Sequence, residues 1–313
     1  MDGEPKKTSL YDEHIKLSGK IIEFAGYLMP VWYEGEGQGV IEEHLSVRNN
    51  VGIFDLSHMG ELFFTGADAY DFLQFVLCND LRKIGNGGCQ YTLLPTEDGG
   101  VVDDLIIYQI NPESYFAVVN AVNIKNDYDW LMKWKEERGY DVSIDNRSDE
   151  LTLIAVQGPR SEAVLTEAGF KNVHCYFPFT HSKVKFDGYT VYLSATGYTG
   201  ERGFELIVDN KYAKSLWARL MEAGAKFNLK PVGLGARDSL RLEAGFCLYG
   251  HELDLSTSVL EANLAWTVCM SKNFLGKEKL QEQKQTGLNK ILFGIKTEKE
   301  TGIPRQNAKI FDE

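Results

Sequence analysis

Apolar and polar residues alternate over short runs along most of the chain, the pattern of strands with one buried face. These runs predict strands at residues 60–65, 89–94, 101–110, 115–120, 151–157, 182–186, 189–194 and 203–208. Between them the apolar positions recur with helical spacing. This spacing predicts helices at residues 10–17, 40–50, 67–77, 123–138, 160–168 and 212–223, with another through residues 240–244.

The order of predicted elements repeats along the chain. Residues 60–138 read as strand, helix, hairpin, strand and helix, and residues 151–223 read the same way. A glycine turn precedes the first helix of each copy, at Gly66 and Gly158. We therefore expect two similar α+β units, each an antiparallel sheet covered by helices.

The remaining stretches give weaker signals. The glycines of residues 232–238 either bind an anion on free backbone amides or form a tight packing corner before a helix. Further predictions are a strand at 20–30 ending in a proline turn, a flexible loop at 35–39, a lysine-rich helix at 276–283, the start of a strand at 291–295 and a strand entering a turn at 307–313.

Composition limits the class of protein. The chain has 313 residues, enough for two or three domains, and its net charge of −12 argues against binding nucleic acid or an anionic membrane. Five scattered cysteines without a Cys-x-x-Cys motif suggest neither a disulfide framework nor a metal site. No apolar run approaches the about 18 residues of a membrane span, and no signal peptide is recognisable. These features favour an intracellular protein.

Two adjacent carboxylates, Asp103 and Asp104, stand at the entrance of the apolar strand 101–110, where aspartate is disfavoured. Side chains alternate across a strand, so the two face opposite sides, and one shares a face with Ile106 and Tyr108. A carboxylate on an apolar face needs a partner. That partner is either a buried arginine or backbone amides, or a ligand that carries N–H groups.

Glu205 is a comparable carboxylate in the second unit, because it alternates with Phe204 and Leu206. Two carboxylates at related positions of repeated units can meet at a central channel. A planar heterocycle with an amino group beside a ring N–H would satisfy one of them through two hydrogen bonds, and Tyr91, Tyr108 and Tyr198 can stack on it or hydrogen-bond to it. His58, beside Asp55 and Ser57, reads as a structural histidine or as an acid/base group.

Several motifs together resemble the folate-dependent aminomethyltransferase family, the T-proteins of the glycine cleavage system. The resemblance runs from residue 8 to about residue 280. It rests on Phe24-Ala25-Gly26, Met29-Pro30, His44-x-x-x-Arg48, Phe54-Asp55-x-Ser57-His58-Met59-Gly60, Gly99-Gly100-x-x-Asp103-Asp104-Leu105, Gln157-Gly158-Pro159, Thr196-Gly197-Tyr198-Thr199-Gly200-Glu201 and Gly233-Leu234-Gly235-Ala236-Arg237-Asp238.

The resemblance implies an α+β, three-domain cloverleaf around a central folate channel. Residues 1–50 with 146–255 would form the folate-binding α+β unit, residues 51–145 the second unit, and residues 256–313 the start of an incomplete C-terminal β-barrel. The implied reaction takes an aminomethyl group from the lipoyl arm of H-protein. It releases ammonia and gives 5,10-methylenetetrahydrofolate, with tetrahydrofolate as co-substrate.

The resemblance also assigns site residues. Asp104 corresponds to the key aspartate beside the folate nitrogens, and Glu205 to the pterin-binding glutamate. The other implied folate-binding residues are Tyr91, Tyr108, Tyr198, Arg237, Phe246 and Trp266. Tyr27 and Phe246 depart from the family's usual Trp and from a Tyr found in some members, while His58 is assigned a structural role.

Two other functions share this resemblance. The first is a tetrahydrofolate-dependent demethylase with another one-carbon donor. The second is a non-catalytic folate-binding relative, but such relatives carry a Lys-Gly-Cys-type motif, and the matching stretch 271–277 has no cysteine. The resemblance implies a cytoplasmic enzyme, or a mitochondrial matrix enzyme if the source is eukaryotic.

Overall fold

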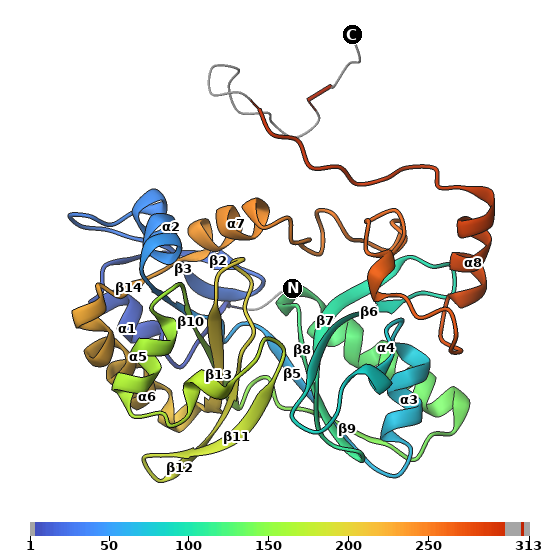
Figure 1. The fold of residues 1–313 in the computed structure, drawn as a ribbon, viewed down its shortest axis with the longest axis horizontal. Coiled ribbons are helices and arrows are strands. Elements are labelled where there is room, and N and C mark those ends of the chain that lie inside the picture. The colour runs from blue at the N-terminus through green and yellow to red at the C-terminus, as the bar shows by residue number, and fades with distance from the viewer. Residues whose placement is uncertain (1–3, 298–307, 310–313) are drawn as a thin grey trace.

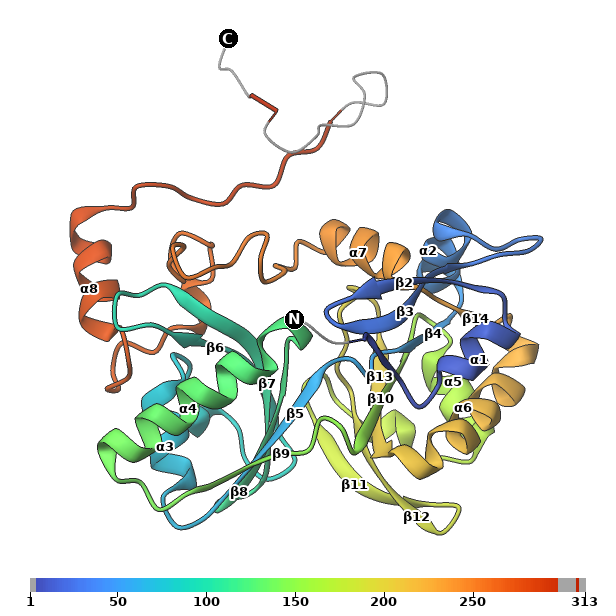
Figure 2. The same cartoon turned by 180° about the vertical axis from the view of Figure 1, so that it is seen from behind.

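The computed structural model describes residues 4–297 and 308–309, which form two sheet-and-helix units lying side by side (Figures 1 and 2). A small third sheet and a C-terminal arm, residues 245–294, are added to these units. The mixed α+β class is therefore confirmed, and no closed barrel occurs in the described part of the chain.

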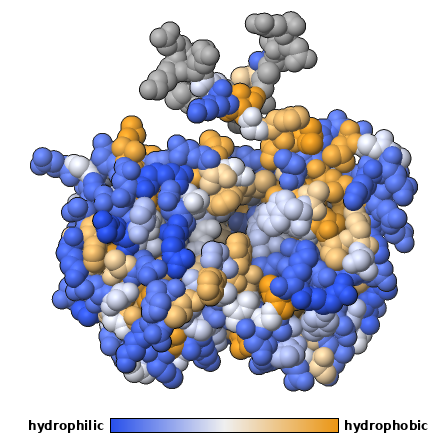
Figure 3. All heavy atoms as spheres, viewed as in Figure 1, coloured by the Kyte–Doolittle hydropathy of each residue, from blue (hydrophilic) through white to orange (hydrophobic). Residues whose placement is uncertain are grey.

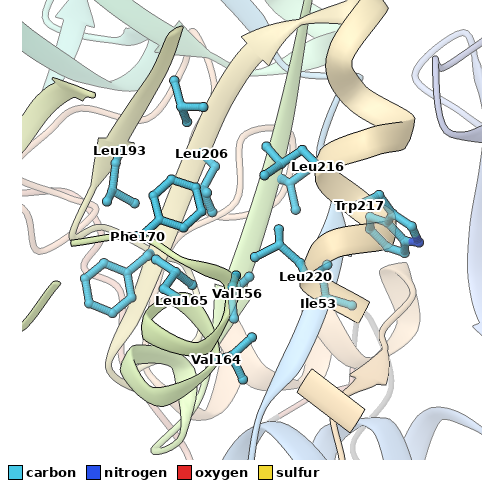
Figure 4. Close-up of a cluster of buried hydrophobic side chains, with 14 of the residues drawn as sticks. Ile53, Val156, Val164, Leu165, Phe170, Leu193, Leu206, Leu216, Trp217 and Leu220 are labelled. Atoms are coloured by element: carbon cyan, nitrogen blue, oxygen red, sulfur yellow. The ribbon is translucent and has the colours of Figure 1, made fainter. Parts of the chain in front are cut away.

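The larger unit is built on a six-stranded sheet in the order β11-β12-β13-β10-β4-β14. Its strands are β4 (Gly52–Asp55), β10 (Leu151–Gln157), β11 (His181–Phe186), β12 (Tyr189–Ser194), β13 (Gly203–Asp209) and β14 (Lys230–Pro231). Helices α5 (Ser161–Ala168) and α6 (Asn210–Gly224) cover one face, where Leu165, Leu206 and Trp217 belong to one apolar core (Figure 4).

The smaller unit is a five-stranded antiparallel sheet in the order β6-β7-β8-β5-β9. Its strands are β5 (Gly60–Thr65), β6 (Cys89–Pro95), β7 (Val101–Asn111), β8 (Ser114–Val119) and β9 (Ser143–Asn146). Helices α3 (Ala69–Val76) and α4 (Ile124–Arg138) pack on one face. The opposite face of each sheet contributes to a shared core that includes Phe54, Tyr108 and Phe116.

The N-terminal segment forms the third sheet, β1-β3-β2, together with two short helices. Its elements are β1 (Lys6–Lys7), α1 (Tyr11–Lys16), β2 (Gly19–Phe24), β3 (Tyr27–Tyr33) and α2 (Val40–Asn49). The single strand predicted at 20–30 is thus a hairpin. Ala25 and Gly26 both have positive φ and reverse the chain, and Pro30 lies inside β3.

After α7 (Leu234–Glu243) the arm crosses the top of the molecule in Figure 1 to reach α8 (Lys277–Thr286) on the smaller unit. The arm packs closely against Gly99 and Gly100, the two glycines that precede β7. Gly99 has a φ of +83°, and a Cβ on Gly100 would lie 2.0 Å from the carbonyl oxygen of Leu255. The pair therefore allows both a tight turn and a close approach of the arm backbone.

Three expectations require correction or comment. Residues 291–295 form no strand, although Leu292 packs on the arm's core and its N–H donates to Glu261. The predicted unit boundary at residue 51 separates β4 from the larger unit, whereas β4 pairs with β10 in the six-stranded sheet. Most of the strand predicted at 307–313 lies outside the described residues.

Candidate functional site

A cavity of about 630 Å³ lies where the two sheets, α7 and the C-terminal arm meet. In the view of Figure 3, the surface is hollowed between the two units and apolar residues gather above the hollow. Both repeated units contribute side chains to it. Its lining includes all eight residues singled out in the sequence: Tyr91, Asp104, Tyr108, Tyr198, Glu205, Arg237, Phe246 and Trp266.

Asp104 enters this cavity from β7, on the strand face it shares with Ile106 and Tyr108. Tyr91 on β6 donates a hydrogen bond of 2.9 Å to its Oδ2, and the Asn120 amide donates one of 2.9 Å to its Oδ1. Burial and the neighbouring Asp103 charge raise the pKa of Asp104 to about 7. A carboxyl with this pKa can both take and give a proton near neutrality.

Asp103 faces the other side of β7, toward α4, and is fully buried. It accepts hydrogen bonds from the Asn120 backbone N–H at 2.9 Å, and from the side-chain amides of Asn120 and Asn123, both at 2.8 Å. The sequence left two kinds of partner open for a buried carboxylate, a protein group or a ligand, and the structure gives a different environment to each aspartate. Asp103 is held by protein amides, and Asp104 faces the cavity.

Asn120 is a site residue that the sequence reasoning missed. It directly follows β8, which pairs with β7, and its side-chain amide lies within hydrogen-bond distance of both aspartates. An asparagine directly after an apolar strand gives only a weak signal, because such residues usually belong to turns.

Glu205 approaches from β13 in the six-stranded sheet and is 9% exposed. Thr196 donates a hydrogen bond to its Oε2. Burial raises the pKa of Glu205 above its ordinary value, while Thr196 and Arg237 oppose the shift. Gly197 and Gly203, on either side of residues 198–202, leave room for the buried Gln157 side chain. A Cβ on Gly197 would lie 2.0 Å from that side chain, and a Cβ on Gly203 would lie 2.3 Å from it.

Two arginines line the cavity, Arg237 and Arg241, and Arg241 is paired with Asp238 and Glu252. The Arg237 guanidinium lies 4.6 Å from the centre of the Tyr198 ring, and among the described residues it forms no hydrogen bond or ion pair. Burial together with the Arg237 charge lowers the pKa of His58 to about 3, so His58 is neutral. Arg237 is thus available to an anionic ligand group, and its charge leaves little scope for His58 as a base.

The aromatic residues form two stacked pairs and one covered ring. Tyr91 stacks on Trp266 and Tyr198 on Phe246, each with ring centres 5.7 Å apart. Tyr108 is different, because Phe116 covers one of its faces at 4.3 Å and its hydroxyl lies 3.5 Å from Thr196. Tyr108 therefore supports the Thr196–Glu205 contact more directly than it offers a stacking face.

The glycine corner before α7 is a packing feature. The buried Glu43 carboxylate accepts hydrogen bonds from the backbone N–H groups of Tyr33 at 2.7 Å and Gly233 at 2.8 Å. A Cβ on Gly233 would lie 2.5 Å from the Val31 backbone. The anion at this helix start is thus the protein's own Glu43, which fixes α7 and with it Arg237.

Two features are absent from the described residues. No helix there combines the length and the apolar character that crossing a bilayer requires. No group of three or more His, Cys, Asp or Glu side chains in residues 4–297 has an arrangement that could hold a metal ion.

Comparison with known proteins gives consistent matches. Residues 10–272 match the family described as GCVT N-terminal domain. An aminomethyltransferase of Chlorobium limicola is 48% identical over 277 residues, covering 87% of this chain and 75% of the relative. One of Chloroherpeton thalassium is 46% identical over 310 residues, covering 98% and 83%.

A solved structure agrees as well. The crystal structure of the glycine cleavage system aminomethyltransferase T from Bartonella henselae aligns with a TM-score of 0.82 at 34% identity. The alignment covers 90% of this chain and 75% of that one. These matches confirm the resemblance inferred from the motifs.

Proposed function

The chain belongs to the aminomethyltransferase (T-protein) family of the glycine cleavage system, a folate-dependent family, and we propose that its cavity binds tetrahydrofolate as co-substrate. The protein is an aminomethyltransferase. The proposal concerns which residues bind the folate, which one carries the chemistry, and which partner brings the one-carbon group.

The donor and acceptor groups of the cavity suit a folate. The Glu205 carboxyl can accept hydrogen bonds from the amino group and adjacent ring N–H of a pterin. Tyr91, Tyr198 and Trp266 offer aromatic surface, and Arg237 has side-chain N–H donors, bonded to no residue that the structure describes, for a carboxylate or for the pterin carbonyl. The six-stranded unit would therefore hold the pterin, with β4 included in that unit.

Asp104 is proposed as the catalytic residue, and one observation carries this assignment. It faces the cavity without any cation partner among the described residues, and its pKa of about 7 is matched to neutral pH. Such a carboxyl can orient the folate nitrogens and exchange a proton with them. In its ionised form it stabilises positive charge that develops on the carbon in transit.

We infer that the aminomethyl group arrives on the lipoyl arm of H-protein. Glycine cleavage system membership supports this partner. The reaction would release ammonia and leave 5,10-methylenetetrahydrofolate and dihydrolipoyl H-protein. Leu242, Phe246 and Trp266 are partly to largely exposed beside the cavity and give an apolar approach for an alkyl arm.

A calorimetric titration with tetrahydrofolate, followed by an assay of methylenetetrahydrofolate formation from aminomethylated H-protein, tests the proposal. Saturable binding and product formation are expected. Binding without product from this donor would favour a demethylase with another donor, and absence of binding would contradict the folate assignment.

A further inference from the structure

Asp127 lies behind the site on the first turn of α4 and is not part of the cavity lining. Its side chain is fully buried, and neither carboxyl oxygen accepts a hydrogen bond from any residue that the structure describes. No Lys, Arg or His among those residues forms an ion pair with Asp103, Asp104 or Asp127. Three carboxyls thus share one buried region without a cation.

An ionised Asp127 does not fit this environment. The start of a helix stabilises an anion only weakly, and this is much less than the cost of desolvating an unpaired carboxylate. A protonated Asp127 has a clear use, because its hydroxyl can then donate to the nearby Asp103 carboxylate; burial first, and then the charge of Asp103, raise the pKa of Asp127. The cluster is consistent with one shared proton on the α4 side.

The cluster is connected to the reacting face through Asn120. The Asn120 side-chain amide lies 2.8 Å from Asp103 Oδ1 and 2.9 Å from Asp104 Oδ1, so the position of one carboxylate constrains the other. Asn123, which precedes α4, fixes Asp103 from the same side at 2.8 Å. Asp127 can therefore influence the position of Asp104 through Asp103 and Asn120.

We propose that Asp127 is a positioning residue for the transfer reaction: it retains its proton and donates it to Asp103, which stays ionised and, through Asn120, holds Asp104 as the proton-exchanging group of the cavity. The proposal rests on the proposed function, because it assumes that Asp104 carries the chemistry.

The titratable groups that face the three carboxyls are uncharged near neutrality. Tyr91 from β6, together with Tyr198 and Cys247 at the cavity, faces Asp104, and burial raises the pKa of each of these three groups. Tyr249 of the arm faces Asp103 and Asp127, and its pKa is also raised. Asp254, whose pKa is lowered, is a further anion that acts on Tyr249. The charge on Asp103 is thus the main electrostatic influence on Asp104 within the cluster.

Carboxyl ¹³C NMR titration of the full chain tests the proposal without requiring turnover. We expect Asp127→Asn, whose amide still donates to Asp103, to leave the midpoint of the Asp104 titration within about 0.3 pH unit of the wild type. Asp103→Asn should lower that midpoint by about 1 unit or more, because it removes the like charge. Asp127→Leu should also lower the midpoint of the Asp104 titration. Without a proton donor at position 127, Asp103 becomes protonated and no longer places a negative charge beside Asp104.

The proposal is overturned if Asp127→Asn lowers the midpoint as much as Asp103→Asn, since Asp127 would then carry a charge, or if Asp127→Leu has no effect. If the variants fail to fold, the wild type decides, because the Asp127 carboxyl should keep its protonated shift between about pH 6 and 8. Titration of Asp127 below that range overturns the proposal. An Asp104→Asn variant with full turnover would instead refute the catalytic role of Asp104, which separates the two failures.

Discussion

Tyr91 donates its hydroxyl to Asp104 across 2.9 Å, from one strand of the β6–β7 hairpin to the other. A hydrogen bond to a carboxylate stabilises the ionised form. It therefore opposes the burial and the Asp103 charge that raise the pKa of Asp104 to about 7.

Replacing Tyr91 with Phe should raise the pKa of Asp104 further. We expect the acidic limb of the kcat/KM profile to move to higher pH by about 0.5–1 unit, the scale of one hydrogen bond. Tyr198→Phe is the matched control, because the Tyr198 hydroxyl donates to the Cys247 carbonyl and not to Asp104. An unchanged acidic limb in Tyr91→Phe would show that Asp104 is not the group titrating in that limb.

Asp104→Asn should reduce turnover by about 10²–10⁴-fold, the range of a lost general acid or base. Tetrahydrofolate binding should persist, because Glu205 and the aromatic residues remain. Asp98→Asn, in the exposed turn just before Gly99, is the control and should turn over normally. Steady-state kinetics with aminomethylated H-protein provide the measurement, and full activity in Asp104→Asn would remove this residue from the mechanism.

Glu205→Gln should weaken tetrahydrofolate binding by about 1.5–3 kcal/mol, because the amide can satisfy only part of the pterin's N–H donors. Calorimetric titration gives the dissociation constant directly. Glu137→Gln, on the exposed side of α4, should leave it unchanged. Equal affinities for Glu205→Gln and the wild type would mean that the pterin does not contact Glu205.

Gly100→Ala should destabilise the docking of the C-terminal arm. A Cβ at this position would lie 2.0 Å from the Leu255 carbonyl oxygen, and overpacking of this kind costs about 1–3 kcal/mol. Gly85→Ala is the control, because a Cβ on Gly85 would meet nothing within 4 Å. Urea unfolding measures both, and equal stability of the two variants would show that the arm adjusts without cost.

Glu61 on β5 should make stability depend on pH. Its side chain is fully buried, neither carboxyl oxygen has a hydrogen-bond partner among the described residues, and burial raises its pKa well above the ordinary value. Above pH about 4.5 the unfolded chain loses this proton while the folded chain keeps it. Folding stability therefore falls as pH rises, by about 1.4 kcal/mol per unit up to the folded pKa.

Glu61→Gln removes this titration. We expect its free energy of unfolding, relative to wild type, to increase steadily from pH 5 upward in urea titrations. Glu137→Gln should track the wild type throughout. A difference between Glu61→Gln and wild type that stays constant with pH would show that Glu61 is already ionised in the folded protein.

Local patterns determined much of the architecture. The spans of β5 and β10 follow from side-chain alternation, and the helices flanking them follow from apolar spacing and glycine turns, because these signals act between residues near one another in sequence. The short strands β4 and β9 were not predicted, because four residues are too few to show a clear alternation. Their strand conformation depends on pairing with distant strands, β4 with β10 and β9 with β5.

The sequence by itself determined the family and marked out Asp104, Glu205 and Arg237 through motifs. The tertiary structure alone decided that Asp103 faces α4 while Asp104 faces the cavity, and that Asn120 links them. It also decided that Arg237 has no protein partner among the described residues and that the anion at the start of α7 is Glu43. These facts depend on contacts between segments far apart in the chain, and burial at those contacts sets each charge.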